Sequence, residues 1–234
     1  IGKSVTVIGS PTDCAFYVVK AQKLMEIRRF HTQKVTAIAV SKNYFSTGSL
    51  DCTMVIWNIR DVSKPPSVIT RHREQITVID MNESANLVVS GSADGLIAIT
   101  LLADATFVRA SRIGGCPAKL SLLSNGDFFV ALNSSSSSKV HLFTQNFTEL
   151  GSAAFKCPVK CMKGFTDVCG DEFVFLVLSD NTLLLIEGND FGVVWKHKDS
   201  SISVTSVDVV RSTKEIVISC RDGRVFLLSR KDQV

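Results

Sequence analysis

The stretch Ser-Leu-Asp-Cys-Thr-Met-Val-Ile-Trp, residues 49–57, places a short polar turn directly before an apolar run. Similar stretches recur downstream at intervals of 43, 43, 43 and 42 residues, and one earlier copy lies 38 residues upstream. The turns of these copies are centred on Asp13, Asp51, Asp94, Ser137, Asp180 and Asp222. A nearly constant interval indicates that the chain is built from one repeated unit.

Each repeat contains short apolar runs of about four to eight residues, rich in Val, Ile, Leu and Phe and separated by Gly, Asn, Asp or Ser, which is typical of buried β-strands. No long amphipathic helical stretch lies between them, which excludes a parallel α/β fold. A repeat of about 40–45 residues with four short strands is typical of a β-propeller. We therefore expect an all-β propeller of four-stranded antiparallel blades, with six blades visible and six or seven in the full ring.

The repeats predict a single propeller domain over residues 1–234. Its blades fall approximately at residues 1–30, 31–72, 73–113, 114–156, 157–199 and 200–234. The first and last blades are incomplete, because the first lacks its opening strand and the last lacks its closing strand. Open strand edges invite aggregation, so we expect the chain to be part of a longer polypeptide that closes the ring as a monomer.

The amino-acid composition argues against a disulfide-rich, a membrane-spanning or a nucleic-acid-binding protein. The chain has 45% hydrophobic residues, a net charge of +4 and seven cysteines, which are irregularly spaced. An odd, irregular set of cysteines fits a reduced compartment better than a disulfide framework. No apolar run approaches the roughly 20 residues of a membrane helix, and the mild positive charge does not indicate a specific nucleic-acid partner. We expect a cytoplasmic protein, with peripheral membrane contact as an open alternative.

Four residues of the second blade are candidates for a buried polar network: His31 before its first strand, Thr47 on the second, Asp51 in the following turn and Trp57 on the third. We expect the Trp57 nitrogen to donate to Thr47, Thr47 to His31, and His31 to Asp51. Buried polar groups must be paired, and a satisfied network makes a blade rigid. We interpret these residues as structural and not as catalytic.

This pattern resembles the WD-repeat family, whose repeat begins with Gly-His and ends with Trp-Asp. The chain departs from it at Phe30, where the family has glycine, and at Asn58, where the family has aspartate. The next blade repeats the first three positions of the network, and threonine replaces tryptophan at the fourth. The residues concerned are His72, Ser90, Asp94 and Thr100.

Three longer stretches of sequence point to one group of proteins within the WD-repeat family. They read Lys-Leu-Met-Glu-Ile-Arg-Arg-Phe-His at residues 23–31, Gly-Ser-Leu-Asp-Cys-Thr-Met-Val-Ile-Trp-Asn at 48–58 and Leu-Val-Val-Ser-Gly-Ser-Ala-Asp-Gly at 87–95. In this order they resemble the C-terminal propeller of BEACH-domain proteins, which are large trafficking scaffolds. The resemblance implies a large cytosolic protein tied to vesicle traffic.

Basic residues gather where the last strand of one blade leads into the first strand of the next. We expect these junctions to emerge on the same face as the turns, where a concentration of like charge favours an acidic partner. The plain alternative is that exposed loops carry lysine and arginine anyway. Lys196 and Lys198 are expected in a loop after a strand that ends at Trp195. The predicted basic face comprises Arg28, Arg29, Lys34, Arg71, Arg73, Lys196 and Lys198.

Other motifs give weaker signals. The five-serine turn Ser134–Ser138 is best interpreted as a solvated turn, with regulatory phosphorylation as the alternative. Asn133-Ser-Ser matches the N-glycosylation pattern, which is common by chance. Cys157, Cys161 and Cys169 lack the spacing of a zinc site, and no phosphate-binding glycine loop occurs. We therefore expect no cofactor and no metal.

Three functions compete. We favour a non-catalytic scaffold that binds proteins or peptides, most simply acidic ones, through its loop face. The alternative is a propeller that binds phosphoinositides or other anionic lipid headgroups at a membrane surface. An enzyme is the least favoured, because no pair of residues forms a plausible nucleophile and base.

Overall fold

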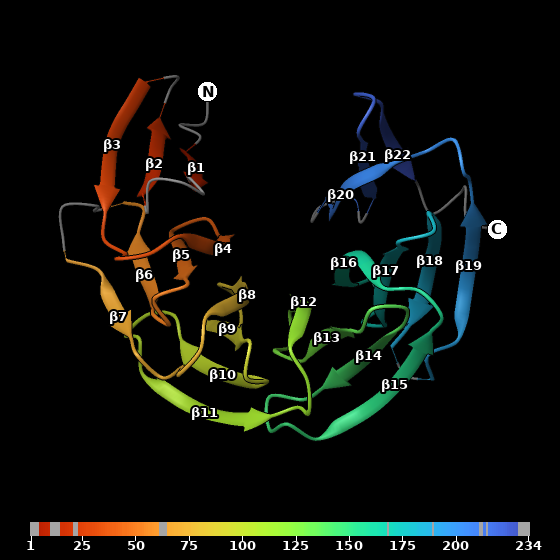
Figure 1. The fold of residues 1–234 in the computed structure, drawn as a ribbon, viewed down its shortest axis with the longest axis horizontal. Coiled ribbons are helices and arrows are strands. Elements are labelled where there is room, and N and C mark those ends of the chain that lie inside the picture. The colour runs from red at the N-terminus through yellow and green to blue at the C-terminus, as the bar shows by residue number, and fades with distance from the viewer. Residues whose placement is uncertain are drawn as a thin grey trace. The chain divides into compact units, whose positions relative to one another are not determined.

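The computed structural model describes the backbone of residues 5–9, 15–20, 23–60, 65–167, 169–188, 190–210, 213 and 215–228, and side chains from residue 30 onward. Every regular element within these ranges is a β-strand, and Figure 1 labels the strands β1–β22. The strands pair into six antiparallel sheets, four with four strands and two with three. The chain divides into two compact units, Ile1–Pro117 and Ala118–Val234.

The first unit contains three of the sheets. The three-stranded sheet consists of β1 (Val5–Gly9), β2 (Ala15–Lys20) and β3 (Lys23–Arg29). The next consists of β4 (Val35–Val40), β5 (Tyr44–Ser49), β6 (Met54–Asn58) and β7 (Ser67–Ile69). The third consists of β8 (Ile76–Asn82), β9 (Leu87–Ser92), β10 (Leu96–Leu101) and β11 (Phe107–Arg112).

The other three sheets belong to the second unit, except that β12 begins at the last residue of the first. The first of them consists of β12 (Pro117–Leu122), β13 (Phe128–Asn133), β14 (Ser138–Phe143) and β15 (Glu149–Phe155). The next consists of β16 (Val159–Thr166), β17 (Glu172–Leu178), β18 (Thr182–Glu187) and β19 (Val193–Lys198). The last consists of β20 (Val204–Val209), β21 (Ile216–Cys220) and β22 (Val225–Leu228).

The residues of the middle strands are buried, whereas those of the last strand of a sheet are mostly exposed. All six residues of β9 are buried, whereas five of the six residues of β11 are exposed. The middle strands are buried in core clusters that join consecutive sheets, such as the one shared by β4–β7 and the strands β8 and β9. Strands covered on both faces need nearly continuous apolar runs, which explains the sequence pattern.

Consecutive sheets are also joined near their first strands. The Thr36 hydroxyl lies 3.1 Å from the Gly48 carbonyl oxygen in its own sheet and 2.5 Å from the Ile76 carbonyl oxygen in the next. Thr77 repeats this one sheet later, 2.8 Å from the Pro117 carbonyl oxygen. Glycine is needed at position 48, because a Cβ atom there would lie 2.5 Å from Ile76 Cγ2. The repeat therefore specifies the contact between neighbouring sheets as well as the strands.

The predicted fold class, an all-β propeller of four-stranded antiparallel blades, is confirmed. Four of the six sheets in the described residues have the four strands of a complete blade, and the two sheets nearest the chain ends have three strands. Five predicted turns connect the second and third strands of their sheets, and the sixth, at Asp13, lies outside the described residues. The strand predicted to end at Trp195 continues to Lys198, because Thr182 and Leu183 of β18 still pair with it. Within the described ranges, no helix long and apolar enough to cross a membrane occurs.

Candidate functional site

The structure brings together three of the four predicted network residues in the sheet β4–β7. His31 lies in the segment between β3 and β4 and is 5% exposed. Its Nε2 atom lies 2.8 Å from Thr47 Oγ1, and its Nδ1 atom lies 3.1 Å from Asp51 Oδ2. The imidazole therefore connects strand β5 to the turn that follows it and fixes the loop leading into β4.

Two threonines that the sequence analysis missed complete this network. Thr53 donates to Asp51 Oδ1 through its hydroxyl at 2.6 Å and through its backbone N–H at 3.0 Å. The Thr32 backbone N–H donates to Asp51 Oδ2 at 2.9 Å. A sequence signal for Thr53 exists, since Asp180 and Thr182 have the same two-residue spacing and form the same two contacts.

Trp57 joins the site differently from the prediction. It does not make the predicted hydrogen bond to Thr47. Its indole, which is 1% exposed, instead stacks on Phe45 with ring centroids 5.7 Å apart and meets Phe30 edge-on at 5.6 Å. Trp57 therefore packs as an apolar ring between Phe45 and Phe30, and Phe30 contributes a ring where the WD repeat has glycine.

The pKa values of the pair follow from burial and hydrogen bonding. Burial lowers the pKa of His31 below 6.5 and outweighs the opposing effect of Asp51, so the imidazole is neutral at neutral pH. Burial alone would raise the pKa of Asp51, but hydrogen bonds from Thr53 and Thr32 and the proximity of His31 together hold it below its usual value. The pair is thus a neutral imidazole beside a carboxylate whose oxygens accept several hydrogen bonds.

The blade formed by β8–β11 also has a histidine, a hydroxyl and an aspartate, but their hydrogen bonds are arranged differently. His72 Nε2 lies 2.8 Å from Ser90 Oγ, as predicted from the repeat. Asp94, however, does not bond to His72: its Oδ2 atom accepts from Arg112 at 2.9 Å and its Oδ1 atom accepts from the Leu96 backbone at 3.1 Å. The prediction that this blade copies the three-residue network is therefore wrong at its third position.

In the last two sheets, the turn aspartate pairs with a basic residue. Lys198 Nζ lies 2.8 Å from Asp180 Oδ2, and this hydrogen bond is the largest of the effects that hold the pKa of Asp180 at about 2. Arg224 Nε lies 2.6 Å from Asp222 Oδ2. All four turn aspartates also accept the backbone N–H two residues further on; the donors are Thr53, Leu96, Thr182 and Arg224.

The predicted basic residues divide into three groups. Lys34, Arg71, Arg73 and Lys196 are exposed, and the Arg71 guanidinium lies 4.5 Å above the centre of the Phe107 ring. Lys198 is paired with Asp180, and it lies with Lys196 on β19 and not in a loop as predicted. Arg28 and Arg29 lie at the end of β3, and their side chains are outside the described part of the structure.

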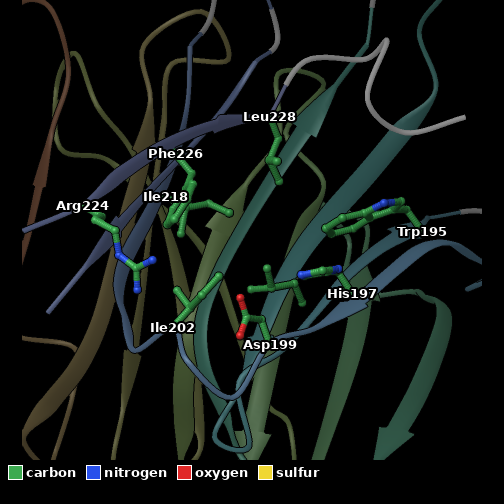
Figure 2. A pocket seen from close by; sticks show the side chains of 9 residues that line it. Trp195, His197, Asp199, Ile202, Ile218, Arg224, Phe226 and Leu228 are labelled. Carbon is green, nitrogen blue, oxygen red and sulfur yellow. The ribbon is translucent and has the colours of Figure 1, made fainter. Parts of the chain in front are cut away.

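A pocket of about 300 Å³ lies in the second unit, beside β19 and β22. Figure 2 shows the ring of Trp195 and the charged groups of Asp199 and Arg224 around apolar side chains that include Ile202. Trp195 stacks on His197 with ring centroids 5.7 Å apart. No cluster of three or more metal-ligating side chains occurs among the described residues, and the pocket is mainly apolar.

Comparison with known proteins agrees with these features. Residues 22–58 and 63–99 match the family model described as WD domain, G-beta repeat. The crystal structure of the computationally designed Ika8 protein resembles this structure with a TM-score of 0.75, covers 97% of this chain and 68% of that one, and is 20% identical in sequence. A similarity at this level of identity shows a shared fold.

Curated relatives extend the comparison over most of the sequence. The chain is 24% identical to BEACH domain-containing protein lvsE of Dictyostelium discoideum over 86% of its length, and 21% identical to BEACH domain-containing protein B of Arabidopsis thaliana over 92%. It is 23% identical to a putative neurobeachin homolog of Caenorhabditis briggsae over 85% of its length. The chain spans 10%, 9% and 8% of these three relatives. It is therefore a β-propeller chain that contains WD repeats and is similar to BEACH-domain proteins over most of its length.

Proposed function

We propose that this chain is a non-catalytic protein-interaction module, the WD-repeat part of a BEACH-type trafficking protein of the cytoplasm. The observation that carries the proposal is that the carboxylates of the turn aspartates are hydrogen-bonded within their own blades. Asp51, Asp94, Asp180 and Asp222 each use their carboxylates to hold a turn and an adjoining basic residue or histidine. Residues that could do chemistry are thus occupied in holding loops, and rigid loops bind partners with little ordering cost.

The network at His31 supports a structural role. A catalytic pair needs an accessible nucleophile beside the base. Here the imidazole is buried, and the hydroxyls next to it, on Thr47 and Thr53, are both hydrogen-bonded within the network. An imidazole enclosed in this way holds the loop before β4 and is not available to a substrate.

The partner we propose is an acidic protein or peptide. Lys34, Arg71 and Arg73 are exposed around the loops of the first unit, and the described contacts include no carboxylate partner for any of them. Exposed charges of one sign speed the approach of an oppositely charged partner, with an effect that falls as salt rises. The cations already paired with turn aspartates, Arg112 and Lys198, contribute less to this field.

Charge reversal tests this proposal. Proteins captured by chemical crosslinking to the chain in its native cells would be purified and titrated against the chain at several salt concentrations. We expect Arg71→Glu with Arg73→Glu to slow association several-fold and to flatten its salt dependence. The control, Arg60→Glu with Lys139→Glu, reverses two exposed charges elsewhere and should leave both quantities near wild type.

Two results would contradict the proposal. Unchanged association and salt dependence in the Arg71/Arg73 variant would show that the partner binds elsewhere. Flotation of the chain with vesicles containing phosphatidylserine and phosphoinositide, lost in the same variant but not in the control, would instead support the membrane-binding alternative.

A further inference from the structure

The pocket beside β19 and β22 has apolar walls and a charged edge. Leu183 and Trp195 of the sheet β16–β19 line it on one side, and Phe226 of β22 lines it on the other. Figure 2 shows the carboxylate of Asp199 and the guanidinium of Arg224 at the edge of the apolar side chains. A volume of about 300 Å³ is at the lower end of the range for ligand pockets, so it suits one long side chain and not a large cofactor.

The charge of Arg224 is balanced within its own sheet. Its Nε atom lies 2.6 Å from Asp222 Oδ2, and its Nη2 atom donates to the Ser201 carbonyl oxygen at 3.2 Å. The guanidinium is thus bound to the turn between β21 and β22 and to the loop before β20. A ligand carboxylate would have to compete with Asp222 for it, so Arg224 is a poor site for an anion.

The carboxylate of Asp199, in contrast, has one oxygen without a partner. Its Oδ1 atom accepts from the Ser201 N–H at 2.8 Å and from the Ser201 hydroxyl at 2.7 Å. Among the described residues, no hydrogen bond or ion pair reaches Oδ2. The hydrogen bonds from Ser201, with smaller effects of His197 and Arg224, hold the pKa of Asp199 below its usual value, so the carboxylate is ionised at neutral pH.

The lysines of β19 do not supply a counterion for this carboxylate. The residues of β19 that line the pocket are Trp195 and His197. Lys196 and Lys198 alternate with them, so these lysines project from the opposite face of the strand. Lys198 is already paired with the aspartate of its own turn. The pocket therefore presents apolar walls next to a charged carboxylate that an incoming group can reach.

We propose that this pocket binds a lysine side chain of a partner protein, with the ammonium group at Asp199 Oδ2 and the methylene stem against the apolar walls. Lysine suits such a site, because its stem packs on apolar surface while its charged end stays close to water. Arginine is less suitable, because its planar guanidinium binds best to both oxygens of a carboxylate, and here Oδ1 already accepts twice from Ser201. This site lies in the second unit and does not depend on the acidic partner proposed for the first.

Short peptides of serine and glycine with one central test residue probe the pocket in the whole chain. Lysine is compared with norleucine, which has the same stem without the charge, and with arginine and glutamate. NMR titrations that follow the indole N–H signals give the dissociation constants, with Trp195 as the reporter and the buried Trp57 as the internal control. We expect the lysine peptide to bind several-fold more tightly than the norleucine peptide, arginine to fall between them and glutamate to bind most weakly.

Two variants test the role of the carboxylate. Asp199→Asn keeps an acceptor for Ser201 but removes the charge, so the lysine and norleucine peptides should then bind about equally. The control, Asp208→Asn, removes an exposed carboxylate elsewhere in the same sheet and should leave the preference for lysine unchanged. The melting temperatures of both variants should stay near that of the wild type, which separates a loss of binding from a loss of fold.

Equal binding of the lysine and norleucine peptides to the wild-type chain, or a preference for lysine that survives Asp199→Asn, would overturn the proposal. Tighter binding of the glutamate peptide would assign ligand binding to Arg224, and tighter binding of the arginine peptide would reject lysine as the occupant. Self-association of the chain that Asp199→Asn abolishes would place the lysine in a second copy and not in a partner. Arg71→Glu with Arg73→Glu should leave binding of the lysine peptide as in the wild type, so this proposal and the proposed function can fail separately.

Discussion

The sheets β4–β7 and β8–β11 carry a histidine, a hydroxyl and an aspartate at the same three positions, but only the first connects all three. In β4–β7, Asp51 meets His31 at 3.1 Å. In β8–β11, Asp94 meets Arg112 at 2.9 Å, and His72 Nδ1 has no hydrogen-bond partner among the described residues. The same residue types therefore form a closed network in one sheet and an open one in the next.

The end of the last strand explains the difference. β11 continues to Arg112, which is paired with Leu96 beside the turn and brings a guanidinium to the carboxylate. β7 ends at Ile69, and the next residue, Thr70, carries no charge. A cation beside the carboxylate forms an ion-paired hydrogen bond and so competes with the neutral histidine. The fourth strand thus decides which partner the turn aspartate takes.

The largest expected effect is at Asp51. Asp51→Ala removes the acceptor for His31, Thr53 and the Thr32 N–H, so we expect the free energy of unfolding to fall by about 1–3 kcal/mol. Urea denaturation measures this. Asp94→Ala should cost less, because Arg112 is 60% exposed and regains water. Asp222→Ala should cost least, since that carboxylate is already 44% exposed. Equal losses for the three variants would refute the distinction between closed and open networks.

Replacing two buried threonines with valine should change the stability of the protein in opposite directions. Thr47 is bonded to His31 Nε2, so Thr47→Val should leave that ring nitrogen unpaired, while Nδ1 keeps Asp51, and should cost about 1–2 kcal/mol. Thr100, in the place of the tryptophan, is fully buried, and its hydroxyl has no partner among the described residues. Thr100→Val should stabilise the protein by about 1 kcal/mol, since an unpaired buried hydroxyl is costly. Thermal and urea unfolding measure both, and a loss of stability in Thr100→Val would indicate a hydrogen bond to water.

Acid should weaken the fold through both buried histidines. Burial lowers the pKa of His31 and His72 below 6.5, so the unfolded chain binds protons that the folded chain resists. Their contribution to stability is complete above pH 6.5 and is lost as pH falls toward the folded pKa, by at most about 1.4 kcal/mol per pH unit for each. Urea denaturation at pH 7.5 and 5.5 measures the slope. The double variant His31→Gln with His72→Gln should show a shallower slope, and an unchanged slope would assign the dependence to other groups.

The smallest change in stability is expected for a substitution of Arg112, which tests directly why the two sheets differ. Arg112→Met should change the free energy of unfolding by only about 0.2–1 kcal/mol, because the ion pair is exposed. It should, however, free Asp94 to accept from His72 and so raise the pKa of that imidazole. NMR titration of the histidines measures this, with His31 as the internal control. No shift at His72 would show that the arginine is not what keeps the two apart.

The sequence predicted the repeated parts of the molecule well. The interval between turns gave the all-β class and the antiparallel four-stranded sheets, because each repeat carries its own strands and its own turn. It also placed His31, Thr47 and Asp51 together, since all three lie within one repeat. Thr53 was missed, although its spacing from Asp51 recurs at Asp180 and Thr182.

Only the tertiary structure decided how groups compete for one partner. That Asp94 takes Arg112 instead of His72 depends on the register between β10 and β11, which the residue pattern does not record. The packing of Trp57 on Phe45, in place of a hydrogen bond to Thr47, depends likewise on how the rings fill the core of its sheet. The sequence by itself determined the repeating strands, because hydrophobic periodicity and turn chemistry are local. The pairing of the polar side chains was decided only in three dimensions, because distance and direction select among several chemically suitable partners.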